Sequence, residues 1–143
     1  MKIQQISLFV ENKPGHISAP SRLLAQAGID IRALYLADTQ RYGILRMIVS
    51  DWREATKVLE AQGFVVKVTE VLAVEVADRP GGLAEVLEPL DGADINIEYM
   101  YAFPYVCEGK AILIFRFADL DAAIERLQTA GLSILASTEL LNK

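Results

Sequence analysis

A short turn occurs twice in this chain, 66 residues apart: NKPGHI at residues 12–17 and DRPGGL at residues 78–83. Each copy follows an alternating apolar run and precedes a segment with helical spacing. Proline fixes one backbone angle and glycine accepts a positive φ, so each copy can lead a strand sharply into a helix. The first N–H groups of such a helix lack intrahelical partners and suit a small anion such as a carboxylate. The repeated turn predicts two similar halves.

The flanking residues repeat in the same register. Alternating apolar residues before each turn indicate a half-buried first strand in each half. The segments after residues 28 and 94 indicate the second strand of each half, and those after residues 43 and 110 indicate the third. Asp51 and Asp119 are suited to cap a second helix in each half. The last strands are predicted at residues 64–69 and 132–138, and Pro89 predicts that its helix ends or kinks after Leu87. Trp52 and Leu120 occupy matching helix positions, so both are expected to be at least partly buried.

Each half is therefore predicted to run strand-helix-strand-strand-helix-strand. This order is the split βαβ arrangement of the ferredoxin-like fold. The predicted fold class is α+β, with two βαββαβ units whose antiparallel sheets carry helices on one face. The predicted domains are residues 1–70 and 71–143, with a break near residues 69–71 and no linker between them.

Composition excludes several classes of protein. A chain of 143 residues with 52% hydrophobic residues has ample material for a core. A net charge of −5 argues against a general nucleic-acid binder, and no apolar run is long enough to cross a bilayer. The single cysteine, Cys107, excludes an internal disulfide framework. The N-terminus lacks the apolar stretch of a secretory signal, so we expect a cytoplasmic protein.

The two turns, each followed by Gly-Ile-Asp-Ile (28–31) or Asp-Ile-Asn-Ile (94–97), resemble those of the ACT domain, a small ligand-sensing module of amino-acid metabolic enzymes. The resemblance covers the chain as a tandem pair. It implies paired domains, often with a continuous eight-stranded sheet, that bind an amino acid at the interface between ACT domains. Free-standing pairs without a catalytic domain are known in the family as sensors or regulators. In one member of the family, the serine-sensing regulatory domain of phosphoglycerate dehydrogenase, the ligand is contacted by the loop before Pro-Gly and by the residue that opens the second strand.

Carried over by position, the resemblance places Asn12 and Asp78 on the loop and Asp30 and Asn96 on the strand. The mixture of acid and amide predicts that the two half-sites are not equivalent. His16 is either a solvated turn residue or part of the pocket wall. The full set of ligand-binding residues predicted is Asn12, Pro14, Gly15, His16, Ile17, Asp30, Ile31, Asp78, Pro80, Gly81, Gly82, Leu83, Asn96 and Ile97.

The sheet face away from the helices is predicted to be apolar. Alternation assigns to it Phe9, Leu34, Leu36, Ile48, Met100 and Ile114, whereas most of Tyr99, Tyr101, Phe103 and Tyr105 should pack onto helices. An apolar face of this kind needs a cover, either from the other half or from a second chain. Together with the family resemblance, it predicts a homodimer.

Three kinds of function are compared. The favoured one is a non-catalytic sensor that binds an amino acid and modulates a partner enzyme of amino-acid metabolism. The alternative is a structural or protein-interaction module of the same fold without a ligand. An enzyme has little support, because no phosphate-binding, dinucleotide-binding, zinc-protease or nucleophile-elbow motif occurs. We therefore expect no catalytic residues, no cofactor, no metal ion, and no nucleic-acid or membrane partner.

Overall fold

The computed structural model describes residues 1–38 and 40–143, which form two compact units. The N-terminal unit comprises Gln4–Thr69, and the C-terminal unit comprises Glu70–Lys143 together with Met1–Ile3. The strand β4 (Val66–Ala77) contributes its first residues to one unit and the rest to the other. Both units have the predicted βαββαβ order with antiparallel strands, which confirms the fold class.

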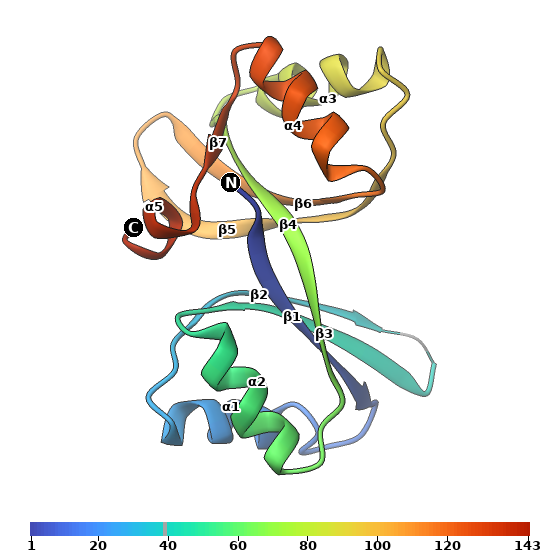
Figure 1. Cartoon of the computed structure of the whole chain (residues 1–143), viewed down its shortest axis with the longest axis vertical. Coiled ribbons are helices and arrows are strands. Elements are labelled where there is room, and N and C mark those ends of the chain that lie inside the picture. Colours follow the sequence, from blue (N-terminus) through green and yellow to red (C-terminus); the bar gives the residue numbers. More distant parts are fainter. Residues whose placement is uncertain (39) are drawn as a thin grey trace. The chain divides into compact units, whose positions relative to one another are not determined.

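In the N-terminal unit the sheet order is β2-β3-β1-β4, and α1 and α2 cover one face of the sheet (Figure 1). The elements of this unit before β4 are β1 (Ile3–Glu11), α1 (Ser18–Gln26), β2 (Ile31–Asp38), β3 (Tyr42–Val49) and α2 (Trp52–Ala61). Its core lies between sheet and helices and is built from alternating strand residues such as Ile6, Leu8 and Met47. Trp52 packs partly buried against this core, as predicted.

In the C-terminal unit the order is β7-β4-β6-β5, and α3 and α4 cover one face (Figure 1). The elements after β4 are α3 (Gly82–Asp91), β5 (Ile97–Cys107), β6 (Lys110–Phe117), α4 (Leu120–Thr129), β7 (Ser133–Leu135) and α5 (Ser137–Leu141). The core again lies under the helices, with Phe115 and Phe117 fully buried and Leu120 partly buried. None of the helices in the described residues combines the length and the apolar character needed to cross a membrane.

The predicted caps of α2 and α4 are confirmed. Asp51 Oδ1 accepts a hydrogen bond of 3.1 Å from the Glu54 N–H, and Asp119 Oδ1 accepts one of 3.0 Å from the Ala122 N–H. Each carboxylate satisfies one of the N–H groups that a helix start leaves without an intrahelical partner.

The predicted end or kink of α3 after Leu87 is replaced by a helix that continues through Pro89 to Asp91. Pro89 lies in the last turn, so it removes only one helical hydrogen bond. The Gly92 N–H still donates to the Glu88 carbonyl oxygen at 3.3 Å. Arg126 Nε donates to the Pro89 carbonyl oxygen at 2.8 Å, and the buried side chain of Leu90 anchors the turn in the core.

The predicted last strand, residues 132–138, is shorter in the structure. The strand β7 ends at Leu135, and Ser137 and Thr138 begin the short helix α5. Glu139 Oε1 accepts a 3.1 Å hydrogen bond from the Ala136 N–H, which closes the helix start. Leu140 is fully buried and fixes α5 to the unit.

Two irregularities in strand pairing change which face some side chains occupy. The register shifts between Ile31 and Ala33 in β2 and between Ile97 and Tyr99 in β5. Directly paired residues on antiparallel strands share a face, and a shift of one residue exchanges the faces. The assignments made after each shift by simple alternation are therefore reversed.

Leu34, Leu36 and Met100 consequently lie on the helix-covered face and not on the face predicted. Leu34 pairs with Met47, Leu36 with Leu45, and Met100 with Phe115, all of which belong to the cores under the helices. The assignments of Phe9, Ile48 and Ile114 to the other face are correct, because they alternate with core residues.

The aromatic residues of β5 are displaced in the same way. Tyr101 pairs with Ile114 and Phe103 pairs with Ile112, so these rings lie on the face away from the helices. Tyr99 pairs with Arg116 on that same face. The prediction that most of these rings pack onto helices is wrong, because the bulge at the start of β5 shifts the alternation by one residue.

Candidate functional site

The two Pro-Gly turns have nearly the same backbone conformation. Gly15 has φ of 87° and Gly81 has φ of 89°, in the left-handed region that glycine adopts at low cost. Gly81 directly precedes α3, and Gly15 lies just before the start of α1. Among the described residues no side chain caps either helix, and both Gly15 and Gly81 are exposed.

The hydrogen bonds of the two turns match as well. The His16 N–H donates to the Lys13 carbonyl oxygen at 3.3 Å, and at the equivalent position the Gly82 N–H donates to the Arg79 carbonyl oxygen at 2.9 Å. The repeat thus preserves a backbone frame and not only a sequence pattern.

Each turn is also fixed to the hairpin that follows it in the sheet. The Asn12 N–H donates to the Arg41 carbonyl oxygen at 2.9 Å, and the Asp78 N–H donates to the Gly109 carbonyl oxygen at 3.0 Å. These bonds hold the loop residue of each half beside the start of the next hairpin strand, β3 or β6.

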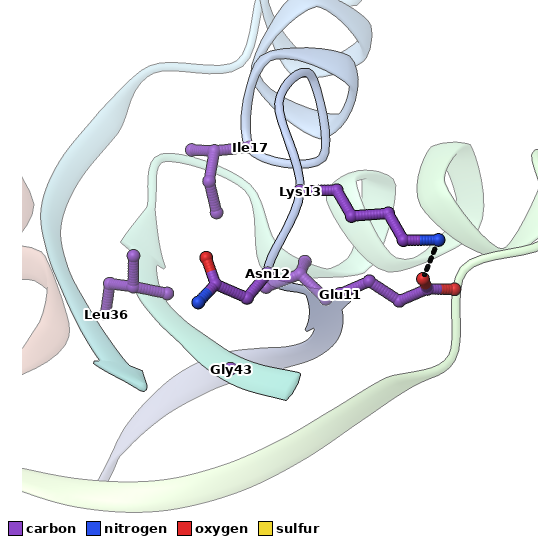
Figure 2. A pocket seen from close by; sticks show the side chains of 7 residues that line it. Glu11, Asn12, Lys13, Ile17, Leu36 and Gly43 are labelled. Carbon is purple, nitrogen blue, oxygen red and sulfur yellow. Dashed lines mark ion pairs between the residues drawn. The ribbon is translucent and has the colours of Figure 1, made fainter. Parts of the chain in front are cut away.

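A pocket lies beside the N-terminal turn (Figure 2). Its empty volume is about 290 Å³, which includes the part open to solvent. Figure 2 shows the Asn12 carboxamide pointing toward Leu36, with Ile17 on the helix side and Gly43 on β3. The lining residues are Val10, Glu11, Asn12, Lys13, Ile17, Leu36 and Gly43.

The pocket offers one neutral polar side chain and a mutually compensated ion pair. Within the described residues the Asn12 carboxamide makes no hydrogen bond, so both its oxygen and its NH₂ group are available. Lys13 Nζ lies 2.8 Å from Glu11 Oε2. That hydrogen bond, with the attraction of the opposite charge, lowers the pKa of Glu11 and raises the pKa of Lys13. Both groups stay charged near neutral pH and cancel each other.

A second hollow, larger and more open, with an empty volume of about 490 Å³, lies on the other side of the same turn. It is lined by Phe9, Val10, Glu11, Gly15, His16, Ala19 and Phe64. Glu11 and Val10 border both hollows, so the turn separates two openings at this end of the unit. His16 is half-buried in the second hollow, and its part in binding stays a prediction.

The family model of the ACT domain pair matches residues 1–143. The chain belongs to the ACT domain pair family. No curated protein matches the chain.

Solved structures agree with this assignment. Protein BT0572 from Bacteroides thetaiotaomicron is 35% identical, with a TM-score of 0.93, and the match covers 100% of this chain and 98% of that one. The ligand-free regulatory subunit of aspartate kinase from Thermus thermophilus is 19% identical, with a TM-score of 0.65 and coverage of 89% and 91%. The regulatory subunit of aspartate kinase from Thermus flavus is 19% identical, with a TM-score of 0.60, and the match covers 90% of this chain and 92% of that one. The last two show a shared ACT-pair fold.

The remaining predicted contact positions lie at the other end of each ACT sheet. Ile31 pairs with Val49 at the end of β3, whereas Val10, next to the turn, pairs with Gly43 at the start of β3. Six residues of strand separate these levels, a distance of about 20 Å. One ACT unit therefore does not bring Asn12 and Asp30 together.

Asp30 and Asn96 have matching local roles. The Ser50 N–H donates to the Asp30 carbonyl oxygen at 2.9 Å, and the Ala118 N–H donates to the Asn96 carbonyl oxygen at 3.2 Å. Asp30 is exposed and its carboxylate lies 3.6 Å from Arg32 Nε. Ile31 and Ile97 pack against the cores of their ACT units.

In the C-terminal ACT unit the turn residues Asp78, Pro80 and Gly81 are exposed, as is Leu83, and Gly82 is buried. Pro14 is exposed in the N-terminal turn. None of these residues lines the two hollows described above. Of the predicted residues, the N-terminal pocket contains Asn12 and Ile17.

Sequence reasoning missed five of the residues that line the N-terminal pocket: Val10, Glu11, Lys13, Leu36 and Gly43. Leu36 was assigned to the opposite face because the bulge in β2 is not visible as a break in alternation. Gly43 interrupts an apolar strand directly opposite Val10, and a glycine in such a strand is a known signal of close approach. No group of three or more His, Cys, Asp or Glu residues suited to a metal ion occurs in the described residues.

Proposed function

We propose that this ACT domain pair is a non-catalytic sensor that binds an amino acid and modulates a partner enzyme of amino-acid metabolism. The observation that carries the proposal is the pocket beside the N-terminal turn, where an unpaired Asn12 carboxamide meets an apolar wall. ACT domains are regulatory modules that bind small molecules such as amino acids, and this chain belongs to that family.

The chemistry of an amino acid matches what the turn offers. Its carboxylate and ammonium both need partners once water is displaced. The left-handed Gly15 directs the backbone into α1, whose first N–H groups suit a carboxylate, and the Asn12 oxygen can accept from the ammonium.

The ligand is proposed to lie between one ACT domain and another. In a single unit, the loop position and the strand position are about 20 Å apart, farther than an amino acid spans. A ligand that contacts both kinds of position needs two domains. Which domains meet at the site, and the part of Asp30, Ile31, Asn96 and Ile97 in it, belong to this proposal.

We also propose a homodimer that is cytoplasmic and regulates an enzyme through protein contact. Phe9 is 57% exposed on the face away from the helices, and Leu34 is 54% and Leu36 49% exposed on the helix-covered face, so burial of this apolar surface in a dimer would be favourable. The fold is shared with the regulatory subunits of aspartate kinase from two Thermus species, which supports an enzyme as the partner class.

The test is a thermal-shift screen of the twenty amino acids. A ligand that binds only the folded chain and is present at 100 times its Kd adds about 2.7 kcal/mol, so the midpoint should rise by about 5–10 °C. The amine that lacks the carboxylate of the active compound serves as control and should give no shift. If no amino acid raises the midpoint by more than about 1 °C at that level, the alternative of a ligand-free interaction module is favoured.

A further inference from the structure

The two halves of the chain share the backbone frame of the turn but differ in the side chains around it. We propose that only the turn and pocket of the N-terminal unit receive the amino acid, and that they take a neutral one with an apolar side chain. This inference rests on the proposed function and specifies its site and its ligand class.

The first step is the shape of the pocket wall. Val10 pairs with Gly43 in the N-terminal unit, and at the same register Val76 pairs with Ala111 in the C-terminal unit. A Cβ atom on Gly43 would lie 3.3 Å from Leu36 Cδ1 and 3.5 Å from Val10 Cγ2, so a methyl group there narrows the pocket. The C-terminal unit carries that methyl group as Ala111.

The opposite wall differs in the other direction. Leu36 pairs with Leu45, and its counterpart Ala102 pairs with Leu113. The N-terminal unit thus combines the long apolar side chain of Leu36 with a glycine on the neighbouring strand. The C-terminal unit has alanine at both of these positions. Only the first arrangement offers both space and an apolar surface for a ligand side chain.

The second step is charge at the turn. In the N-terminal unit the loop residue is Asn12 and the helix position four residues after Gly15 is Ala19, and both are neutral. The equivalent residues of the C-terminal unit are Asp78 and Glu85. Glu85 is paired with Arg79, so Asp78 is the carboxylate near the start of α3 that opposes the approach of a ligand carboxylate.

The basic residue of the turn also has a different partner in each half. The guanidinium of Arg79 pairs with Glu85 in the first turn of α3, whereas its counterpart Lys13 pairs backwards with Glu11 on β1. α3 begins at Gly82, while α1 begins at Ser18, two residues later in the repeat. An ion pair therefore lies on the first turn of α3 in the C-terminal unit, whereas the lysine of the N-terminal turn pairs away from α1.

The third step concerns the ligand side chain. Ile17, Leu36 and Val10 form an apolar wall, and the two charged lining residues neutralise each other. A charged ligand side chain would lose its hydration without gaining an unpaired opposite charge. A neutral, apolar side chain has no such hydration to lose, and it is stabilised by burial of its apolar surface.

The experiment is titration calorimetry with L-leucine, L-phenylalanine, L-aspartate and L-lysine against the full chain. We expect one of the two apolar amino acids to bind with one site per chain and at least tenfold more tightly than the two charged ones. A stoichiometry of two per chain, or tighter binding of aspartate or lysine, would overturn the inference.

Matched substitutions exchange single residues between the halves. We expect Asn12→Asp, which changes charge without changing shape, to weaken binding at least tenfold, and Asp78→Asn to leave it within twofold. We likewise expect Gly43→Ala to weaken binding at least tenfold and Ala111→Gly to leave it unchanged, with circular dichroism showing that each variant is folded. Loss of binding in the C-terminal variants, or none in the N-terminal ones, contradicts the site assignment.

Failure of the proposed function and failure of the site assignment give different results. If none of the twenty amino acids binds, the proposed function fails. If an amino acid binds but the substitutions in the C-terminal unit are the ones that weaken binding, the sensor function stands and the inference about its site is wrong. If a charged amino acid binds most tightly, the inference about the ligand class is wrong.

Discussion

Gly82→Ala is expected to destabilise the chain by about 3 kcal/mol, the upper end of the range for overpacking. A Cβ atom at this position would lie 1.9 Å from the carbonyl oxygen of Ala77 and 3.0 Å from its carbonyl carbon. Both atoms are backbone, so relief requires the end of β4 or the start of α3 to move. Urea unfolding followed by circular dichroism measures the loss.

Two substitutions separate the causes of this effect. Gly81→Ala has no atom within 4 Å of the new Cβ but retains φ of 89°, so it should cost about 1–2 kcal/mol from backbone strain alone. His16→Ala alters the repeat-equivalent of Gly82 and should change stability by less than about 0.5 kcal/mol. If Gly82→Ala unfolds at the same urea concentration as the parent chain, the close approach of α3 to β4 is not real.

Phe115→Ala is expected to reduce the free energy of unfolding by about 4 kcal/mol. Phe115 is fully buried on the central strand β6, and its ring stacks on Phe117 with centroids 5.4 Å apart. Truncation removes a large apolar side chain and leaves a cavity that the sheet cannot close. Phe115→Leu retains most of the volume and should cost less than half as much.

The same variant tests our proposal that residues 1–70 and 71–143 are two domains closely coupled in folding. Trp52 is the single tryptophan and belongs to the N-terminal unit, so its emission reports on that unit alone. Because β4 is a strand of both units, we expect the emission and circular dichroism transitions to shift together. A tryptophan transition that stays at the parent midpoint would show that the units unfold independently.

The sequence was sufficient to predict the repeated architecture because its signals are local. Alternation located β1 and β3, Asp51 and Asp119 marked the starts of α2 and α4, and Pro-Gly marked the turns. Each of these depends on a residue and its near neighbours, which a single sequence contains.

Errors arose where pairing between strands decides the outcome. The bulges near Ile31 and Ile97 reverse the faces of the residues after them, yet neither interrupts the apolar alternation. Leu36 was therefore placed on the wrong face and missed as a pocket residue. The helix α5 was missed for a similar reason, because Leu140 becomes a core residue only after the chain has folded back.

Gly82 illustrates a further limit. From sequence it is one of two interchangeable turn glycines, but only Gly81 has the left-handed conformation. Gly82 is required instead by its contact with the Ala77 carbonyl group, which no local pattern reveals.

The central claim is that an amino acid binds at the turn and pocket of the N-terminal unit. The most direct test is an NMR titration of the ¹⁵N-labelled chain with the amino acid that gives the largest thermal shift. The account predicts that the largest amide shifts fall in Asn12–Ile17 and around Leu36 and Gly43, with the equivalent Asp78–Leu83 and Ala111 little changed. Largest shifts at Asp78–Leu83, or a spectrum that saturating ligand leaves unchanged, would contradict it.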